Sequence, residues 1–401
     1  MGLKTAAVLG IGAVCALVAS CSSGSSGSAA TSTQAPPVTV LTSGAVNNGD
    51  GDIFLAPQGA GQAGTGQYAA GPEIVSAAGK VLWFHPLPAG STVTDFRTQS
   101  YLGKPVLTWF QSGTGNGSDD GEGVIYDGQY KQIATVKPAN GYQPDFHEFL
   151  ITPWNTALIL ADKPGTANLT SLGLSAHQQV IDGVVQEIDI KTGKLLFQWD
   201  SAAHVPYSDS HAPMPPSGGA WDWFHINAVH LDTDGNLLIS SRFTWTIYKV
   251  NIRTGAIMWQ LGGKHTTFTL KTAPGQKLDS AGEIFAFQHD PEAIGDDEYT
   301  VFDDESDGQT TLFPVSRAVT IKLDLAASTA TLIKSVDQPE GLVAGATGSA
   351  QTTRNGDLFV SWGGLSYFSE FSPSGKLLFN AKLPNGVGTY RAYRLPWNPG
   401  S

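Results

Sequence analysis

Short segments in which apolar and polar residues alternate follow one another along most of the chain, and turns rich in glycine separate them. One unit shows this clearly, with four such segments at 228–231, 236–240, 246–251 and 256–261. Alternation with a period of two is typical of β-strands, and the intervening residues show no convincing helical period. The pattern therefore predicts antiparallel sheets made of consecutive strands.

One phrase recurs along the chain: a tight turn followed by an apolar strand that often ends in an aromatic residue. A ring of such sheets is a β-propeller, and six copies predict six blades of an all-β fold. A β-sandwich is the alternative fold, but it would not by itself produce the repeated phrase. The copies are marked by the turn residues Gly79, Gly128, Gly193, Gly255 and Gly375, and by a weaker turn near Ala326.

The beginning of the chain differs from the rest. Lys4 precedes an apolar run from Thr5 to Ala19, which is the layout of a secretory signal, and the run ends in Val-Ala-Ser before Cys21, like the lipobox of bacterial lipoproteins. We expect a signal peptide over residues 1–20, a flexible Ser/Gly/Pro-rich tether over 21–48 and the propeller over 49–401. Lipidation of Cys21 would anchor the protein to the membrane on the extracytoplasmic side of the cell envelope.

Composition narrows the possible chemistry. Both cysteines, Cys15 and Cys21, lie in the first segment, so the predicted propeller has no thiol nucleophile and no disulfide. The net charge of −12 disfavours nucleic acid as a partner. An anionic substrate would need a local cationic pocket.

Three histidines occupy the same position in successive repeats, at the start of the strand expected to be innermost. They are His147, His225 and His289. Positions that are equivalent by repeat are equivalent about the propeller axis, so we expect the three side chains at one end of the central channel. Arg242 follows His225 across one hairpin, which returns the guanidinium to the same end.

Histidine and arginine without a carboxylate triad favour binding of an oxyanion such as sulfate or phosphate. A neutral imidazole could attack sulfur while cationic donors hold the oxygens, and nearby positive charge would lower the pKa of that imidazole. Lys163, at the matching position of another repeat, is interpreted as a solvated loop charge. Aromatic residues could form a wall for a phenol ring, although core packing is expected for at least half of them; the candidates are Phe224, Trp245, Phe285 and Phe287.

Two other functions remain open from the residues alone. The three histidines could hold a divalent metal in a hydrolase or lyase, although they lack a local metal-ligand spacing. The propeller could also bind an envelope ligand without catalysis. We expect neither a metal nor a cofactor.

Several motifs occur together in the chain: 52–57 (DIFLAP), 222–227 (DWFHIN), 240–242 (SSR), 287–290 (FQHD) and 390–394 (YRAYR). With these motifs the chain resembles the bacterial arylsulfate sulfotransferases over about residues 51–397, and more closely their arylsulfotransferase-like group in actinobacteria and fungi.

The resemblance implies a six-bladed propeller that moves a sulfuryl group from an aryl sulfate donor to a phenolic acceptor, without the usual nucleotide sulfate donor. It implies that His289 is transiently sulfated. It further implies that His147, His225 and Arg242 bind the sulfate and stabilise the transition state, with Asn227 at a neighbouring substrate-binding position.

Overall fold

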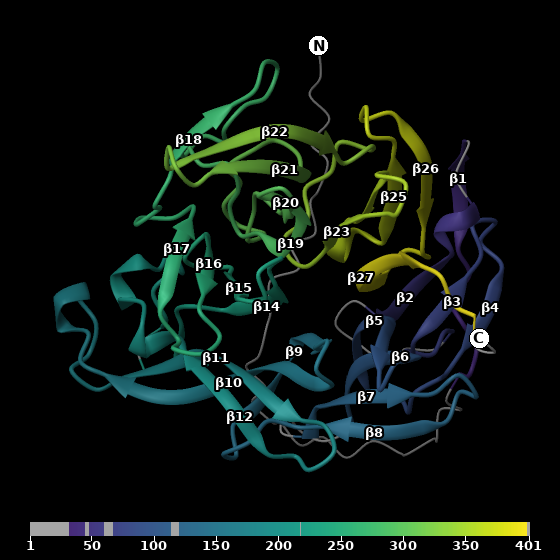
Figure 1. Ribbon diagram of the computed structural model, residues 1–401, viewed down its shortest axis with the longest axis horizontal. Coiled ribbons are helices and arrows are strands. Elements are labelled where there is room, and N and C mark those ends of the chain that lie inside the picture. The colour runs from purple at the N-terminus through teal and green to yellow at the C-terminus, as the bar shows by residue number, and fades with distance from the viewer. Residues whose placement is uncertain (1–31, 45–47, 60–66, 114–119, 217, 399–401) are drawn as a thin grey trace, which may run out of the picture.

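The computed structural model describes residues 32–44, 48–59, 67–113, 120–216 and 218–398. Six β-sheets of four or five strands surround a central axis (Figure 1). The predicted all-β, six-bladed propeller is therefore confirmed. The predicted signal peptide and Cys21 lie outside the described residues. Within the described ranges, no helix is long and apolar enough to cross a membrane.

The first three blades each contain four consecutive antiparallel strands, from the axis outward. In the second blade, β13 (Trp221–Asp222) also pairs with β11 in parallel. The strands are β5 (Thr92–Tyr101), β6 (Lys104–Ser112), β7 (Glu122–Tyr126) and β8 (Gln132–Val136); β9 (Gln143–Ile151), β10 (Thr156–Ala167), β11 (Gln178–Asp189) and β12 (Leu195–Asp200); and β14 (Ile226–Leu231), β15 (Leu237–Ser241), β16 (Thr246–Val250) and β17 (Ile257–Leu261).

The last three blades repeat this arrangement, and two of them have an added strand at the outer edge. β18 (Thr269–Thr272) pairs in parallel with β22. The other strands are β19 (His289–Gly295), β20 (Glu298–Asp303), β21 (Arg317–Asp324) and β22 (Thr329–Asp337); β23 (Ser349–Thr352), β24 (Leu358–Ser361), β25 (Tyr367–Phe371) and β26 (Leu377–Lys382); and β27 (Val387–Leu395), β2 (Asp52–Gly59), β3 (Glu73–Val75) and β4 (Val81–Phe84).

The ring closes because both ends of the chain share a blade. β27, from the C-terminal part, is the inner strand of the sheet whose outer strands β2, β3 and β4 come from the N-terminal part. β1 (Thr39–Ser43) adds a fifth strand to the preceding blade by pairing with β26. Residues 39–43 were expected in the tether, but their backbone groups find hydrogen-bond partners on the free edge of β26.

The repeated turns lie at one place in every blade, between the third and fourth strands. The turn must reverse the chain tightly, and Gly79 and Gly255 adopt positive φ there, at 77° and 73°. In the weaker copy, Ser328 adopts the positive φ (50°) at the end of the turn. The glycines that mark the repeat in the sequence therefore lie in the outer hairpins of the blades.

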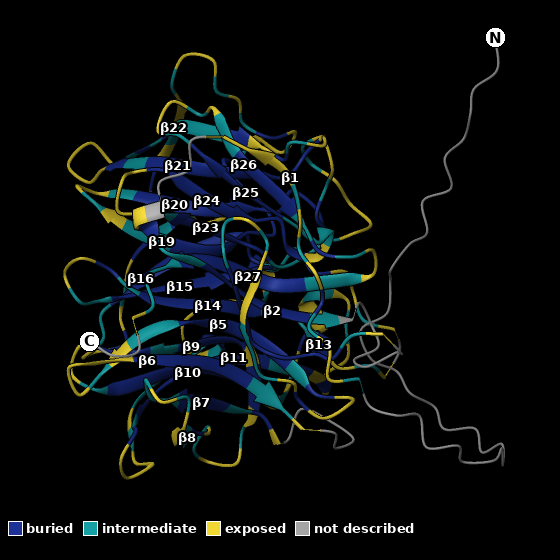
Figure 2. Cartoon of the chain, turned by 90° about the vertical axis from the view of Figure 1, so that its right-hand side faces the viewer, coloured by how far each residue is buried: buried dark blue, intermediate teal, exposed yellow. Residues whose placement is uncertain are grey.

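The hydrophobic core is divided among the spaces between neighbouring blades, and one cluster of buried residues lies between each pair. The middle strands of a blade contact a neighbouring blade on each side, so β15, the second strand of its blade, is buried at every position, whereas the outer β17 alternates. Figure 2 shows the buried strands inside and the exposed turns outside. The inner strands contact one another in a closed order around the axis.

Candidate active site

The N-terminal ends of the inner strands bring polar side chains together around the axis. His147 and His225 have ring centroids 5.1 Å apart, and His147 and His289 lie 6.2 Å apart. Tyr390 of β27 packs its ring edge against His147, with centroids 5.6 Å apart. The structure thus brings together the three histidines that the repeat register singled out. Tyr390 begins the 390–394 motif (YRAYR), but the sequence alone assigned it no role.

Each histidine is backed by an aspartate, so the expectation of a site without a carboxylate triad is wrong. Nδ1 of His147 lies 2.8 Å from Oδ1 of Asp145, and Nδ1 of His289 lies 2.6 Å from Oδ2 of Asp304. Nδ1 of His225 is hydrogen-bonded to Asp222.

A sequence signal for these pairs existed. Asp145 and Asp222 precede their histidines by two and three residues, and Asp304 shares the hairpin register of Arg242. An aspartate on Nδ1 fixes the orientation of the imidazole and leaves Nε2 toward the centre of the site.

His289 is neutral and carries a lone pair on Nε2. The backbone N–H of Thr347 points at Nε2 from 3.3 Å, so the ring proton lies on Nδ1 and is donated to Asp304. Burial, followed by the charge of Arg242 and of the other two histidines, lowers the pKa of His289 well below its usual value. The direction agrees with the sequence argument, but burial contributes more than the nearby charge.

Asp304 is isolated from the acidic residues on either side of it. Arg317 forms ion pairs with Asp303 and Glu305, and its Nη2 lies 2.7 Å from Asp303. Asp304 alone turns to His289, and its second oxygen, Oδ1, is buried without a hydrogen-bond partner among the described residues. Burial raises the pKa of Asp304 well above its usual value, which makes its ionised form costly in the folded protein.

Arg242 lies at the same end of the axis, as expected from the hairpin. Its backbone N–H donates to the carbonyl of His225 (3.0 Å), and its Nη2 donates to the carbonyl of Gly345 (2.6 Å). The guanidinium sits over the rings of Phe243 and Phe287, at 5.1 and 5.6 Å from their centroids. Its Nε is buried and has no partner in the described part of the chain. Donors therefore remain for an anionic ligand.

Asn227 is buried and joins two blades. Its Nδ2 donates to the backbone carbonyl of Gln288 (2.7 Å), directly before His289. The Gln288 side chain in turn donates to Ser240 Oγ and to the carbonyl of Ser241, both at 3.0 Å. These bonds place His289 relative to the strand that leads to Arg242. The amide oxygen of Asn227 has no partner within the described ranges.

Of the four aromatic residues considered for the phenol wall, two lie in the hydrophobic core and two lie near Arg242. Phe224 and Phe285 are in the hydrophobic clusters between blades. Trp245 stacks on His211, with centroids 3.6 Å apart, and contacts Phe287 near Arg242. Sequence analysis missed Phe146 and Phe243 as wall residues.

Phe146 is 39% exposed and stacks on His147 with centroids 4.2 Å apart. Phe243 packs against His225 at 5.1 Å. These two rings offer apolar contact area next to the histidines.

Lys163 lies on β10, not in a loop, and pairs with Asp200. The residue that shares the surroundings of the site is its neighbour Asp162. Burial, followed by the charges of Asp145 and Asp222, raises the pKa of Asp162 to about 8.

The three histidines are not spaced to share one metal ion. Among the described residues, two groups of potential ligands have donor atoms within 4.8 Å of one another, Glu148 with His230 and Asp290, and Asp50 with Asp357 and Glu370. The histidine trio is not one of them. This geometry weighs against the three-histidine hydrolase or lyase.

A propeller with three aspartate-backed histidines and a partly unpaired arginine at one end of its axis offers hydrogen-bond donors to an anionic group. A family model, arylsulfotransferase (ASST), matches residues 97–383. The chain belongs to this family, and the membership makes it a sulfotransferase.

Other comparisons are more distant. No curated protein sequence matches the chain. Among solved structures, a protein of unknown function from Bacteroides caccae is 12% identical, with a TM-score of 0.49 over 86% of this chain and 99% of the other. A catalytically inactive virginiamycin B lyase from Staphylococcus aureus, crystallised with quinupristin, is 10% identical, with a TM-score of 0.41 over 85% and 86% of the two chains.

Proposed function

We propose that the protein transfers a sulfuryl group from an aryl sulfate to a phenol through a sulfohistidine at His289. The observation that carries the proposal is the lone pair on Nε2 of His289, held by Asp304 behind the ring and by the Thr347 amide beside it. In the first half-reaction the Thr347 N–H releases Nε2 of His289, the Nε2–S bond forms as the bond from sulfur to the aryl oxygen breaks, and the phenolate leaves. In the second, a phenol oxygen attacks sulfur and the S–N bond returns its electrons to Nε2.

Arg242 and His147 hold the sulfuryl oxygens in this proposal. Arg242 has donors free for an anion, including the buried Nε. Burial lowers the pKa of His147, so its Nε2 carries no proton in the free protein, since Asp145 accepts the proton on Nδ1. An arriving sulfate ester brings negative charge, which favours proton uptake by His147 and turns its Nε2 into a donor.

His225 exchanges the proton with the phenol. Its side chain is 27% exposed, against 4% for His147 and 1% for His289. The most accessible imidazole is the one that can meet a leaving or entering phenol oxygen near solvent. Its partner Asp222 keeps a low pKa although burial alone would raise it, because His225 stabilises the carboxylate. The phenol ring packs against Phe146 and Phe243.

Donor and acceptor use the same entrance. Below the histidines, the axis is filled by buried charged side chains, among them Glu148, His230 and Asp290. A separate cavity of about 580 Å³ opens toward the C-terminal ends of the inner strands and is lined by other residues, including Glu292 and Gln351. One entrance for both substrates agrees with a ping-pong order, in which the first product leaves before the acceptor binds.

The test is mass spectrometry of the protein incubated with a chromogenic aryl sulfate and no acceptor. We expect one acid-labile sulfuryl adduct on His289, one equivalent of phenol released, and loss of the adduct on adding a phenol. His177, which is exposed, provides the matched control as His177→Ala against His289→Ala. Aryl sulfate binding without phenol release, and unchanged in His289→Ala, would instead identify a non-catalytic binding propeller.

We also propose that the protein is lipid-anchored at Cys21 in the cell envelope, since the first 21 residues have the layout of a lipoprotein signal. Mass analysis of the N-terminal peptide from membranes tests this. A peptide that begins before Cys21 and carries no lipid would refute it.

A further inference from the structure

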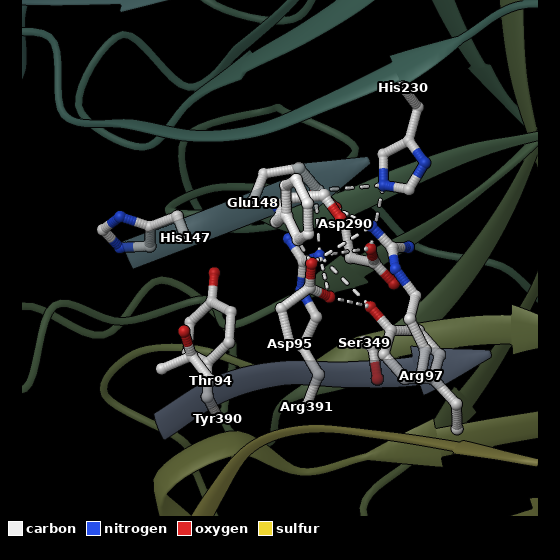
Figure 3. Close-up of polar contacts among 12 residues, drawn as sticks. Thr94, Asp95, Arg97, His147, Glu148, His230, Asp290, Ser349, Tyr390 and Arg391 are labelled. Atoms are coloured by element: carbon white, nitrogen blue, oxygen red, sulfur yellow. Dashed lines mark hydrogen bonds and ion pairs between the residues drawn. The ribbon is translucent and has the colours of Figure 1, made fainter. Parts of the chain in front are cut away.

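A network of buried charges fills the axis directly below the histidines (Figure 3). Nη1 of Arg391 lies 2.9 Å from Glu148 and 3.3 Å from Asp290. Nε2 of His230 lies 3.3 Å from Glu148 and 3.1 Å from Asp290. Asp95 also contacts Arg391, at 3.4 Å. Arg97 completes the network by pairing with Asp95 and Glu148.

Three members of this network directly follow a residue of the active-site end in sequence. Glu148 follows His147, Asp290 follows His289, and Arg391 follows Tyr390. In a regular strand two consecutive side chains point to opposite faces, but β9, β19 and β27 each have a register shift at this point. Figure 3 shows the ring of His147 directed away from the charged network, while Glu148 is directed toward His230.

The network also restrains strained backbone. Asp95 and Asp290 have positive φ, 53° and 51°, a conformation uncommon for residues other than glycine. Oδ2 of Asp290 accepts from the backbone N–H of Ala350 (3.3 Å), and Oδ2 of Asp95 accepts from that of Phe149 (3.0 Å). The same carboxylates therefore bind both a neighbouring inner strand and the charged centre.

His230, on β14, forms ion pairs with Glu148 on β9 and Asp290 on β19, and so links three inner strands. Burial alone would lower its pKa, but Glu148 and Asp290 raise the pKa of His230 to about 10, so it is charged at neutral pH. The network then contains three cations, His230, Arg97 and Arg391, and three carboxylates, Asp95, Glu148 and Asp290. The group of Glu148, His230 and Asp290 has ligand spacing for a metal ion, but Arg391 already supplies a cation to both carboxylates.

We propose that His230 is a positioning residue of the transfer reaction: by binding Glu148 and Asp290 together, it sets the orientation of His147 and His289, their neighbours in sequence. The expected effect on turnover rests on the proposed function, whereas the expected effect on the orientation of His147 and His289 does not. His225 is the internal reference, because its own partner Asp222 lies outside the network.

The experiment compares wild type with His230→Gln and Glu148→Gln, and uses His177→Gln as the matched control on an exposed histidine. The first readout is nuclear magnetic resonance of isotopically labelled histidine, which reports the ring N–H protons shared with aspartates. We expect both network variants to shift the signals of His147 and His289 more than that of His225, whose partner Asp222 lies outside the network. The second readout is turnover, where we expect kcat to fall at least ten-fold while KM changes less than three-fold.

Folded network variants with wild-type histidine signals would overturn the proposal, and so would unfolding of both variants, because the network would then serve the fold and not the site. If wild type proves unable to transfer a sulfuryl group, the proposed function fails. The resonance measurement still decides the positioning role in that case, since it needs no turnover.

Discussion

Asp304 is the residue at which activity and stability are expected to change in opposite directions. In Asp304→Asn, the carbonyl oxygen of the new amide would turn to Arg242, which offers only donors, and the amide N–H would face Nδ1 of His289. The proton of His289 then moves to Nε2, and the lone pair that attacks sulfur is lost. Asparagine in place of an aspartate that orients a catalytic histidine lowers kcat by about 10⁴-fold in a serine protease. We expect about 10³-fold here, or roughly 4 kcal/mol of barrier.

Stability should respond the other way. The pKa of Asp304 is raised by burial above its value in the unfolded chain, so the ionised carboxylate costs free energy of folding at neutral pH. A neutral amide removes that cost, and Oδ1 has no hydrogen bond to lose among the described residues. The free energy of unfolding of Asp304→Asn should therefore equal or exceed that of wild type.

The assay is release of a coloured phenol from an aryl sulfate with a saturating phenol acceptor, together with urea denaturation of the same preparations. Asp324→Asn is the matched control, because Asp324 is exposed at the end of β21 in the same blade. A kcat for Asp304→Asn within five-fold of wild type would refute the tautomer argument. A loss of stability would refute the argument from burial.

Four further outcomes are expected. Arg242→Lys loses the planar fork of donors and should lower kcat/KM by about 10- to 100-fold in steady-state assays, whereas a change under three-fold would contradict the assigned role. Phe146→Ala should raise KM for aryl sulfates about five-fold, or ~1 kcal/mol, with an unchanged melting temperature; equal KM values would remove the ring from the substrate wall. The first half-reaction should keep its rate as the pH falls through 6.5 in stopped-flow measurements, because the pKa of His289 lies well below that value; a half-maximal rate at pH 6.5 would contradict this. The charge of His230 should contribute up to about 5 kcal/mol of stability that is complete below pH 6.5 and lost as the pH rises through about 10, since its folded pKa exceeds the unfolded one; equal losses in wild type and His230→Gln on denaturation at pH 7 and 10.5 would refute it.

The blade architecture could be predicted because it depends on local signals. The turn at Gly255 needs positive φ, and the outer strand β17 after it alternates in burial, so both leave a mark at a fixed place in each repeat. The same register placed His147, His225 and His289 at one end of the axis. Strand β1 was missed because an edge strand is defined by its partner β26, which is distant in sequence.

The sequence by itself determined the repeat, the number of blades, the end of the channel at which the histidines gather and the return of Arg242 to that end. These follow from period, turn chemistry and antiparallel pairing, which act over a few residues. Only the tertiary structure decided which carboxylates support the histidines and how far each histidine is buried. It also decided that Glu148, Asp290 and Arg391 meet below them, because register shifts in the inner strands turn consecutive side chains in directions that simple alternation does not predict.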